Sequence, residues 1–170
     1  ADEMVRYCKD RNPGCFILTS TNGHFFRGEE RCRRVLDSGI DAILFSVDGA
    51  RQESYARYRI GGRIERVFTA METLARLRRA AGRRRPLLIW RYILFAWNDS
   101  PGEMEEARRK ARELGVDELA WHLNCVESIP SSGRYHPGSP HLPEIAGELW
   151  DTLQERLDID LGVDFTSYGR

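Results

Sequence analysis

The sequence has little lysine, no long apolar run and no excess of charge of either sign. Basic and acidic residues both number 26, so net charge gives no argument for nucleic acid, an anionic membrane surface or a polyanionic substrate. Lys9 and Lys110 are the only lysines, so almost all of the basic residues are arginines. We interpret this preference as a bias of the genome before we look for a functional reason. No apolar run is long enough to span a bilayer, and the N-terminus lacks a signal-peptide pattern. We therefore expect a soluble, cytoplasmic protein without a nucleic-acid or membrane partner.

The cysteines are too scattered for a disulfide scaffold or a paired zinc signature. We expect buried thiols at all of them: Cys8, Cys15, Cys32 and Cys125. His122 and Cys125 would make half of a metal site, but nothing completes it, and an ordinary pair of strand-end residues is the better interpretation. The Gly-x-Ser-x-Gly elbow, the phosphate loop and the dinucleotide-binding Gly-x-Gly-x-x-Gly motif are all missing. The sequence therefore leaves the catalytic residues unknown and predicts no metal ligand.

What the chain does have is an alternation of apolar runs and amphipathic segments. Hydrophobic residues make up 41% of the 170 residues, enough for a globular domain with a sizeable core. Apolar runs predict strands at residues 15–19, 42–47, 86–97 and 117–123. Helical spacing predicts helices at residues 1–12, 29–38, 64–81 and 101–114. A long loop at 128–143, an amphipathic helix containing Leu149 and Leu153, and a short strand at 159–165 follow.

Strands that alternate with helices predict an α/β fold with a parallel sheet. About four βα units would form part of a TIM-like (β/α)6 barrel or a small open sheet. We expect residues 1–127 to form this partial barrel and residues 128–170 to pack on it. Polar residues that follow the strands should then meet at one rim, where parallel α/β proteins bind ligands. They are Ser20, Thr21, Asn22, Ser46, Asp48, Asn98, His122 and Asn124.

Three features of this rim suggest ligand chemistry, each with a plain alternative. Ser46 and Asp48 share a strand face and suit a vicinal diol such as a ribose, but Asp48 is equally explained as a turn residue before a glycine. Arg59 suits a ligand carboxylate, or else pairs with a nearby acid at the surface. The glycine pair at 61–62 opens a long helix and could receive an anion, but a flexible loop is the preferred interpretation.

Several short motifs occur in a characteristic order. They are Thr-Asn-Gly at 21–23, Ser-Gly-Ile-Asp at 38–41, Phe-Ser-Val-Asp-Gly at 45–49, Tyr-Arg-x-Gly-Gly at 58–62 and, after Asn98, Leu-Gly-Val-Asp at 114–117. Together they resemble radical S-adenosylmethionine (SAM) enzymes, within the branch of SPASM-type peptide and protein maturases, over residues 1–124. The resemblance implies a partial (β/α)6 barrel that binds SAM beside a 4Fe-4S cluster. The resulting 5′-deoxyadenosyl radical would act on a peptide or small-molecule substrate.

The same resemblance implies roles for five residues. Ser46 would contact the SAM ribose or its surroundings and Arg59 the methionine carboxylate, while Asn22, Asp48 and Asn98 would line the same rim. The cysteines cannot supply the Cys-x3-Cys-x2-Cys loop that holds the cluster in that family. We therefore expect the C-terminal part of a catalytic barrel, cut from a longer protein and inactive alone.

Two other functions stay open. One is a non-enzymatic domain that uses the same rim to bind a nucleotide-like ligand or a protein. The other is an unrelated barrel enzyme with His122 as general base.

Overall fold

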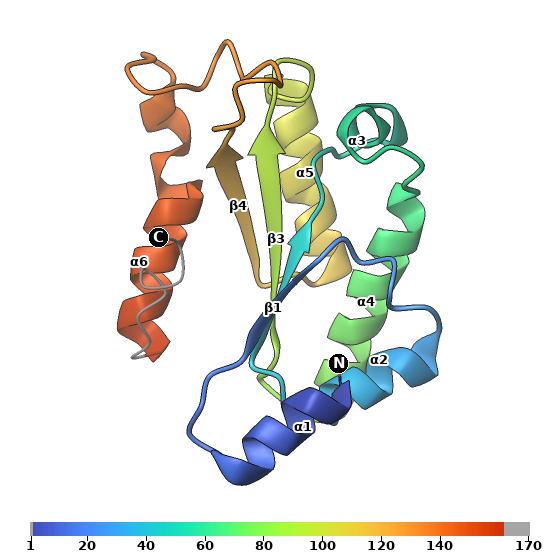
Figure 1. Cartoon of the computed structure of the whole chain (residues 1–170). Helices are drawn as coiled ribbons and strands as arrows, with labels where there is room; N and C mark the ends of the chain where they lie inside the picture. The colour runs from blue at the N-terminus through green and yellow to red at the C-terminus, as the bar shows by residue number, and fades with distance from the viewer. Residues whose placement is uncertain (1, 162–170) are drawn as a thin grey trace.

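Four parallel strands form the centre of the protein, and helices connect them. The computed structural model describes residues 2–161 and side chains up to residue 157 (Figure 1). The sheet has the order β1-β2-β3-β4, all parallel. The elements are α1 (Asp2–Arg11), β1 (Leu18–Thr21), α2 (Glu29–Leu36), β2 (Ala42–Ser46), α3 (Gln52–Tyr58), α4 (Ile64–Ala80), β3 (Leu87–Leu94), α5 (Pro101–Leu114), β4 (Glu118–Leu123), the 3-10 helix η1 (Leu142–Glu148) and α6 (Trp150–Leu161). The predicted α/β fold with parallel βα repeats is confirmed.

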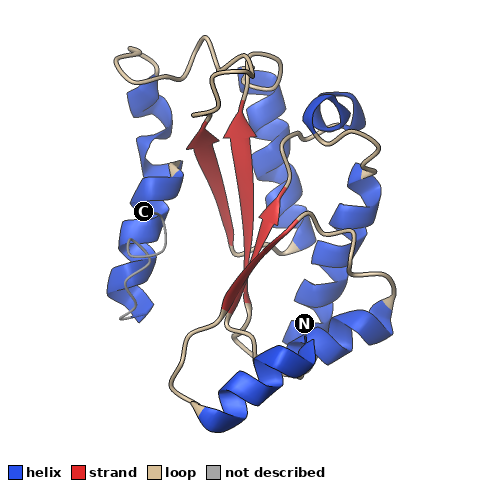
Figure 2. Ribbon diagram, viewed as in Figure 1, coloured by secondary structure: helices blue, strands red, loops and turns tan. Residues whose placement is uncertain are grey.

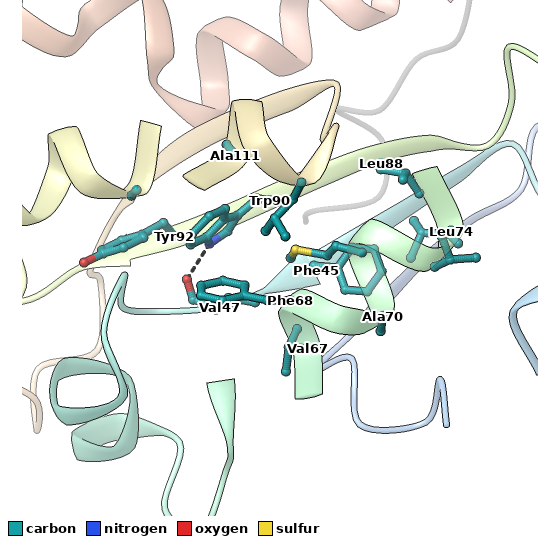
Figure 3. Close-up of a cluster of buried hydrophobic side chains, with 14 of the residues drawn as sticks. Phe45, Val47, Val67, Phe68, Ala70, Leu74, Leu88, Trp90, Tyr92 and Ala111 are labelled. Atoms are coloured by element: carbon teal, nitrogen blue, oxygen red, sulfur yellow. Dashed lines mark hydrogen bonds between the residues drawn. The ribbon is translucent and has the colours of Figure 1, made fainter. Parts of the chain in front are cut away.

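The two faces of the sheet have different cores, because successive strand residues point to opposite sides. On the face that we call the α4 face, Phe45 and Trp90 are register partners and pack with Phe68 of α4 (Figure 3). The Trp90 indole Nε1 donates to the Val47 carbonyl at 2.7 Å, which ties the end of β2 to the middle of β3. Each such aromatic or aliphatic side chain contributes about 1.5–3 kcal/mol when fully buried. This face supplies most of the apolar burial.

The opposite face, which we call the α6 face, has a smaller core. Leu44, Ile89 and Ala120 of three neighbouring strands are buried against Leu153 and Leu157 of α6. Figures 1 and 2 show α6 on the other side of the sheet from α4 and α5. Helices thus cover the centre of the sheet on both faces.

The caps of α5 follow from the sequence. The Ser100 hydroxyl accepts from the Glu103 amide at 3.3 Å, Pro101 occupies the first turn, and Gly115 ends the helix with a φ of 71°. The Glu103 side chain turns toward α3, where its carboxylate accepts hydrogen bonds from the Ala50 amide, at 2.9 Å, and from the Ser54 hydroxyl. This carboxylate anchors α3, a helix that apolar periodicity did not predict.

The C-terminal part differs from the expectation. The predicted amphipathic helix is divided into η1 and α6, and Leu149 between them bridges to Trp121 of β4. The predicted strand at 159–165 is wrong at 159–161, where α6 continues, and residues 162–165 lie outside the described residues. The division of the chain at residue 127 stays a prediction.

Two other expectations concern the cysteines and the membrane. Buried thiols are confirmed only for Cys32. Cys8 and Cys125 are exposed and Cys15 is half-buried, and α1, which carries Cys8, buries none of its residues. None of the helices in residues 2–161 is both long and apolar enough to cross a membrane. A cytoplasmic location stays a prediction.

Candidate functional site

Asp48 lies directly behind the end of β2 and is fully buried. Its Oδ2 accepts from Arg59 Nε at 2.7 Å and from Arg59 Nη2 at 2.6 Å, and its Oδ1 accepts from the Ile93 amide at 2.9 Å. Burial raises the pKa of Asp48, while the Arg59 charge and the Ile93 amide oppose that rise. The two-pronged contact fixes the direction of the Arg59 guanidinium. Contact of Asp48 with a ligand diol stays a prediction.

Asn98 is also fully buried and joins the ends of β2 and β3. Its Nδ2 donates to the carbonyls of Asp48, at 3.1 Å, and Ile93, at 3.0 Å. Its Oδ1 accepts from the Phe95 amide at 2.7 Å. The side-chain amide of Asn98 therefore hydrogen-bonds backbone groups that strand pairing leaves without a partner. Its predicted role in lining a ligand site is untested.

Arg59 and Asn22 open onto a pocket at the carboxyl end of the sheet, which we call the rim pocket. It has a volume of ≈ 270 Å³. Its lining is Asn22, His24, Arg27, Tyr55, Arg59, Ile60, Gly61, Gly62 and Arg66. A neighbouring pocket of ≈ 360 Å³ shares His24, Arg27 and Arg66 with it. Neither lining contains an aspartate or a glutamate, so three arginines and a histidine face the rim pocket without an acid among them.

The positive charges of the rim pocket affect the pKa of His24. Burial lowers the pKa of His24, and the positive charges of Arg66 and Arg27 lower it further. The ring Nε2 lies 3.2 Å from the Tyr55 hydroxyl. Within residues 2–161, neither Arg27 nor Arg66 pairs with a carboxylate, whereas Arg76, farther along α4, pairs with Glu29. Arg59 is paired with Asp48, so the unpaired positive charge of the rim pocket comes from Arg27 and Arg66, which no carboxylate among the described residues neutralises.

Glycines and one glutamine bring these segments together. Gly23 has a φ of 79°, and a Cβ there would lie 2.5 Å from Val67 Cγ1, so the loop after β1 packs closely on α4. A Cβ at Gly62 would lie 2.7 Å from Tyr55 Cε1. Gln52 donates to the Gly62 carbonyl at 3.0 Å and accepts from the Ile64 amide at 2.9 Å. These contacts place His24, Arg27 and Arg66 around one space.

The same contacts occupy backbone amides at the start of α4. The Gly62 amide donates to the Arg59 carbonyl at 2.8 Å, and the Ile64 amide donates to Gln52. An anion in the rim pocket would therefore meet side chains before it met these amides. Close packing against Tyr55 accounts for Gly62, and the flexible loop preferred from the sequence stays a prediction.

Ser46 lies apart from the rim pocket, on the α6 face. Its hydroxyl accepts from Arg91 Nη2 at 2.9 Å and lies 3.4 Å from the Ser20 hydroxyl. His122 is half-buried, and burial followed by the charge of Arg91 lowers its pKa. The structure thus brings Asn22 and Arg59 together, with Asp48 and Asn98 behind them, and separates Ser46. Ligand roles for all five residues, and His122 as a general base, stay predictions.

Comparisons with known proteins give no family. No family model and no curated protein matches the sequence. Among solved structures, the chain is similar to a 2,3-dimethylmalate lyase, described as a PEP mutase/isocitrate lyase superfamily member. The identity is 14% and the TM-score 0.48, and the alignment covers 96% of this chain and 67% of that chain. A likeness of this size carries no argument about activity.

The prediction of a radical SAM enzyme of the SPASM branch is wrong. The similar solved structure is a lyase of another superfamily, and no family model supports the resemblance. The predicted cofactors, SAM and a 4Fe-4S cluster, are withdrawn with it, because the described residues contain no group of three or more His, Cys, Asp or Glu side chains that could hold a metal. The alternative of a domain for a nucleotide-like ligand or a protein partner also finds no matching relative. Predictions about partners stay untested.

Proposed function

We propose that the protein binds a small phosphorylated molecule through its phosphate group in the rim pocket. The observation that carries the proposal is the convergence of Arg27, Arg59 and Arg66 on a pocket without an acidic side chain. A guanidinium presents several N–H donors in a plane, which suits phosphate oxygens. A phosphate ester has a charge of about −1.5 to −2 at neutral pH, enough to balance more than one of these arginines.

The fixed position of the Arg59 side chain in the pocket also supports phosphate binding. Asp48 holds Arg59 from behind, so this guanidinium does not have to be ordered when the ligand binds. Asn22 and Tyr55 add neutral hydrogen-bonding groups to the lining. A volume of ≈ 270 Å³ is near the lower end of ligand pockets, about 300 Å³, and suits a phosphate with a short organic group.

Calorimetric titration with inorganic phosphate tests the proposal. Arg66→Gln should weaken binding by roughly ten- to a hundred-fold, since one charge-assisted hydrogen bond contributes about 1.5–3 kcal/mol. Arg84→Gln is the matched control, because it removes the same charge from a turn beyond the other end of α4. Equal affinity of the wild type and Arg66→Gln, or equal losses in both variants, would refute specific binding in the rim pocket.

A further inference from the structure

Arg91 is a half-buried arginine on the α6 face that has no acidic partner within the described residues. It is the register partner of Ser46, and its Nη2 donates to the Ser46 hydroxyl at 2.9 Å. Its Nε is buried and has no hydrogen-bond partner. By contrast, Arg59 and Arg108 are also partly buried, and each lies 2.6 Å from a carboxylate oxygen. The contrast marks Arg91 as a charge that no carboxylate of the described side chains pairs with.

The nearby acid is already engaged elsewhere. Asp48 raises the pKa of Arg91, but its two oxygens are hydrogen-bonded to Arg59 and to the Ile93 amide. Burial has the larger, opposite effect and lowers the pKa of Arg91. Arg59, Arg91 and Asp48 together carry one positive charge in excess. Partly desolvated charges are costly unless they are paired, so this location favours an anion.

The groups around Arg91 favour a carboxylate. The hydroxyls of Ser20 and Ser46 lie 3.4 Å apart, and with the Arg91 guanidinium they form a row across three neighbouring strands. Below this row, Leu44 and Ile89 close the α6 face with apolar side chains. A single uncompensated guanidinium with two hydroxyls matches a planar group of one negative charge. A dianionic phosphate is better matched by the three arginines of the rim pocket.

We infer that the α6 face carries a second anion site, where Arg91, Ser46 and Ser20 bind the carboxylate of a small organic acid. The site lies on the α6 face and uses Arg91, whereas the rim pocket uses Arg27, Arg59 and Arg66. His122, on the neighbouring strand, has a pKa that burial and the Arg91 charge lower against the smaller, opposite effects of Asp151 and Asp48, so its ring is mainly neutral at pH 7. It can therefore donate a hydrogen bond to a carboxylate without adding charge.

An NMR titration with acetate tests the inference in the full chain. The backbone amides of Ser46 and Ile93 and the Arg91 Nε–H should shift and saturate in the wild type. The apparent acetate affinity should fall at least tenfold in Arg91→Gln and remain within twofold in Arg66→Gln. Arg91→Lys, which keeps the charge but loses the planar fork, should show an intermediate loss and serves if Arg91→Gln does not fold.

The two proposed sites can fail separately. Acetate shifts that are absent from Ser46 and Ile93, or that persist unchanged in Arg91→Gln and Arg91→Lys, would overturn the carboxylate site. The response to phosphate at Arg27 and Arg66 reports on the rim pocket alone, so loss of one response with retention of the other identifies the wrong proposal. Acetate that competes with phosphate in the rim pocket, without any shift at Ser46, also counts against the carboxylate site.

Discussion

At the scale of single residues, Asp48 determines where Arg59 lies. Its carboxylate is buried and binds the guanidinium and the Ile93 amide at once. The sequence leaves two interpretations of Asp48 open, a ligand contact or a turn residue, and it suggests pairing only for Arg59, as a surface arginine beside an unspecified acid. For Arg59 the structure shows the plain alternative, a pairing with a nearby acid. This acid is Asp48, which is buried behind the rim pocket. A pair separated by eleven positions is set by the fold of α3 and is invisible to strand or helix periodicity.

His24 gives the rim pocket a pH dependence. Its pKa lies below the usual value of 6.5, so the neutral ring dominates at pH 7 in the free protein. A bound anion favours the imidazolium, so anion affinity should rise as pH falls below 6.5 through the lowered pKa of the folded state. Sulfate is the suitable probe because its own charge does not change in this range. Calorimetry between pH 7.5 and 5.5 should show a several-fold gain in wild type.

His24→Gln is the control for this gain, since it keeps a hydrogen-bonding side chain that does not titrate. The variant should bind sulfate with an affinity that is flat across the same range. A gain of equal size in His24→Gln would assign the pH dependence to another group. The sign for stability is the reverse: the unliganded protein should lose stability as pH falls below 6.5, because the folded state resists protonation of His24.

At the scale of elements, the long helices and buried strands follow from the sequence, but α3 and the loop after β1 depend on tertiary contacts. The apolar spacing of α4 and the caps of α5 are local signals, and the structure confirms both elements. α3 has only seven residues and is held by Glu103 from α5. His24 and Arg27 were missed because no local pattern indicates that their loop touches α4. The Asn-Gly pair at 22–23 predicts a tight turn, but it does not indicate that this turn contacts α4.

Gly23 and Gly138 form a pair for testing that loop. Both have a positive φ, 79° and 83°, so alanine at either position has a backbone cost of at least about 1 kcal/mol. Only at Gly23 would the new Cβ meet another atom, 2.5 Å away on Val67, whereas nothing lies within 4 Å at Gly138. Gly23→Ala should therefore lower the free energy of unfolding by about 1–3 kcal/mol more than Gly138→Ala in urea denaturation. Equal losses would show that the close packing of this loop on α4 does not matter.

Glu103 tests the anchoring of α3. Glu103→Gln keeps an oxygen that can accept from the Ala50 amide and the Ser54 hydroxyl but removes the charge that strengthens both hydrogen bonds, which should cost about 1–2 kcal/mol of stability. α3 carries Tyr55, and Arg59 follows it directly, so hydrogen exchange should quicken in α3 and phosphate affinity should fall. Glu105→Gln, on the exposed side of α5, is the control and should change neither quantity. Unchanged exchange in α3 with Glu103→Gln would contradict the anchoring role.

At the scale of the whole molecule, one parallel sheet presents two kinds of polar surface near its carboxyl edge. The rim pocket lies where the loop after β1 meets α3 and the start of α4, and the Arg91 row lies on the α6 face. The fold class was predictable because alternating apolar runs and amphipathic segments restrict the topology strongly. The family was not, because short motifs of glycine, asparagine and aspartate also serve turns and buried hydrogen bonds, as Gly23, Asp48 and Asn98 do here.

The most direct test of the account is to locate phosphate on the protein. In a two-dimensional 15N NMR titration with inorganic phosphate, the account predicts saturable shifts confined to the amides of residues 22–28 and 59–66, together with the Nε–H groups of Arg27, Arg59 and Arg66. Saturable shifts centred on any other part of the chain, or no saturable shift at all, would contradict an anion-binding function of the rim pocket.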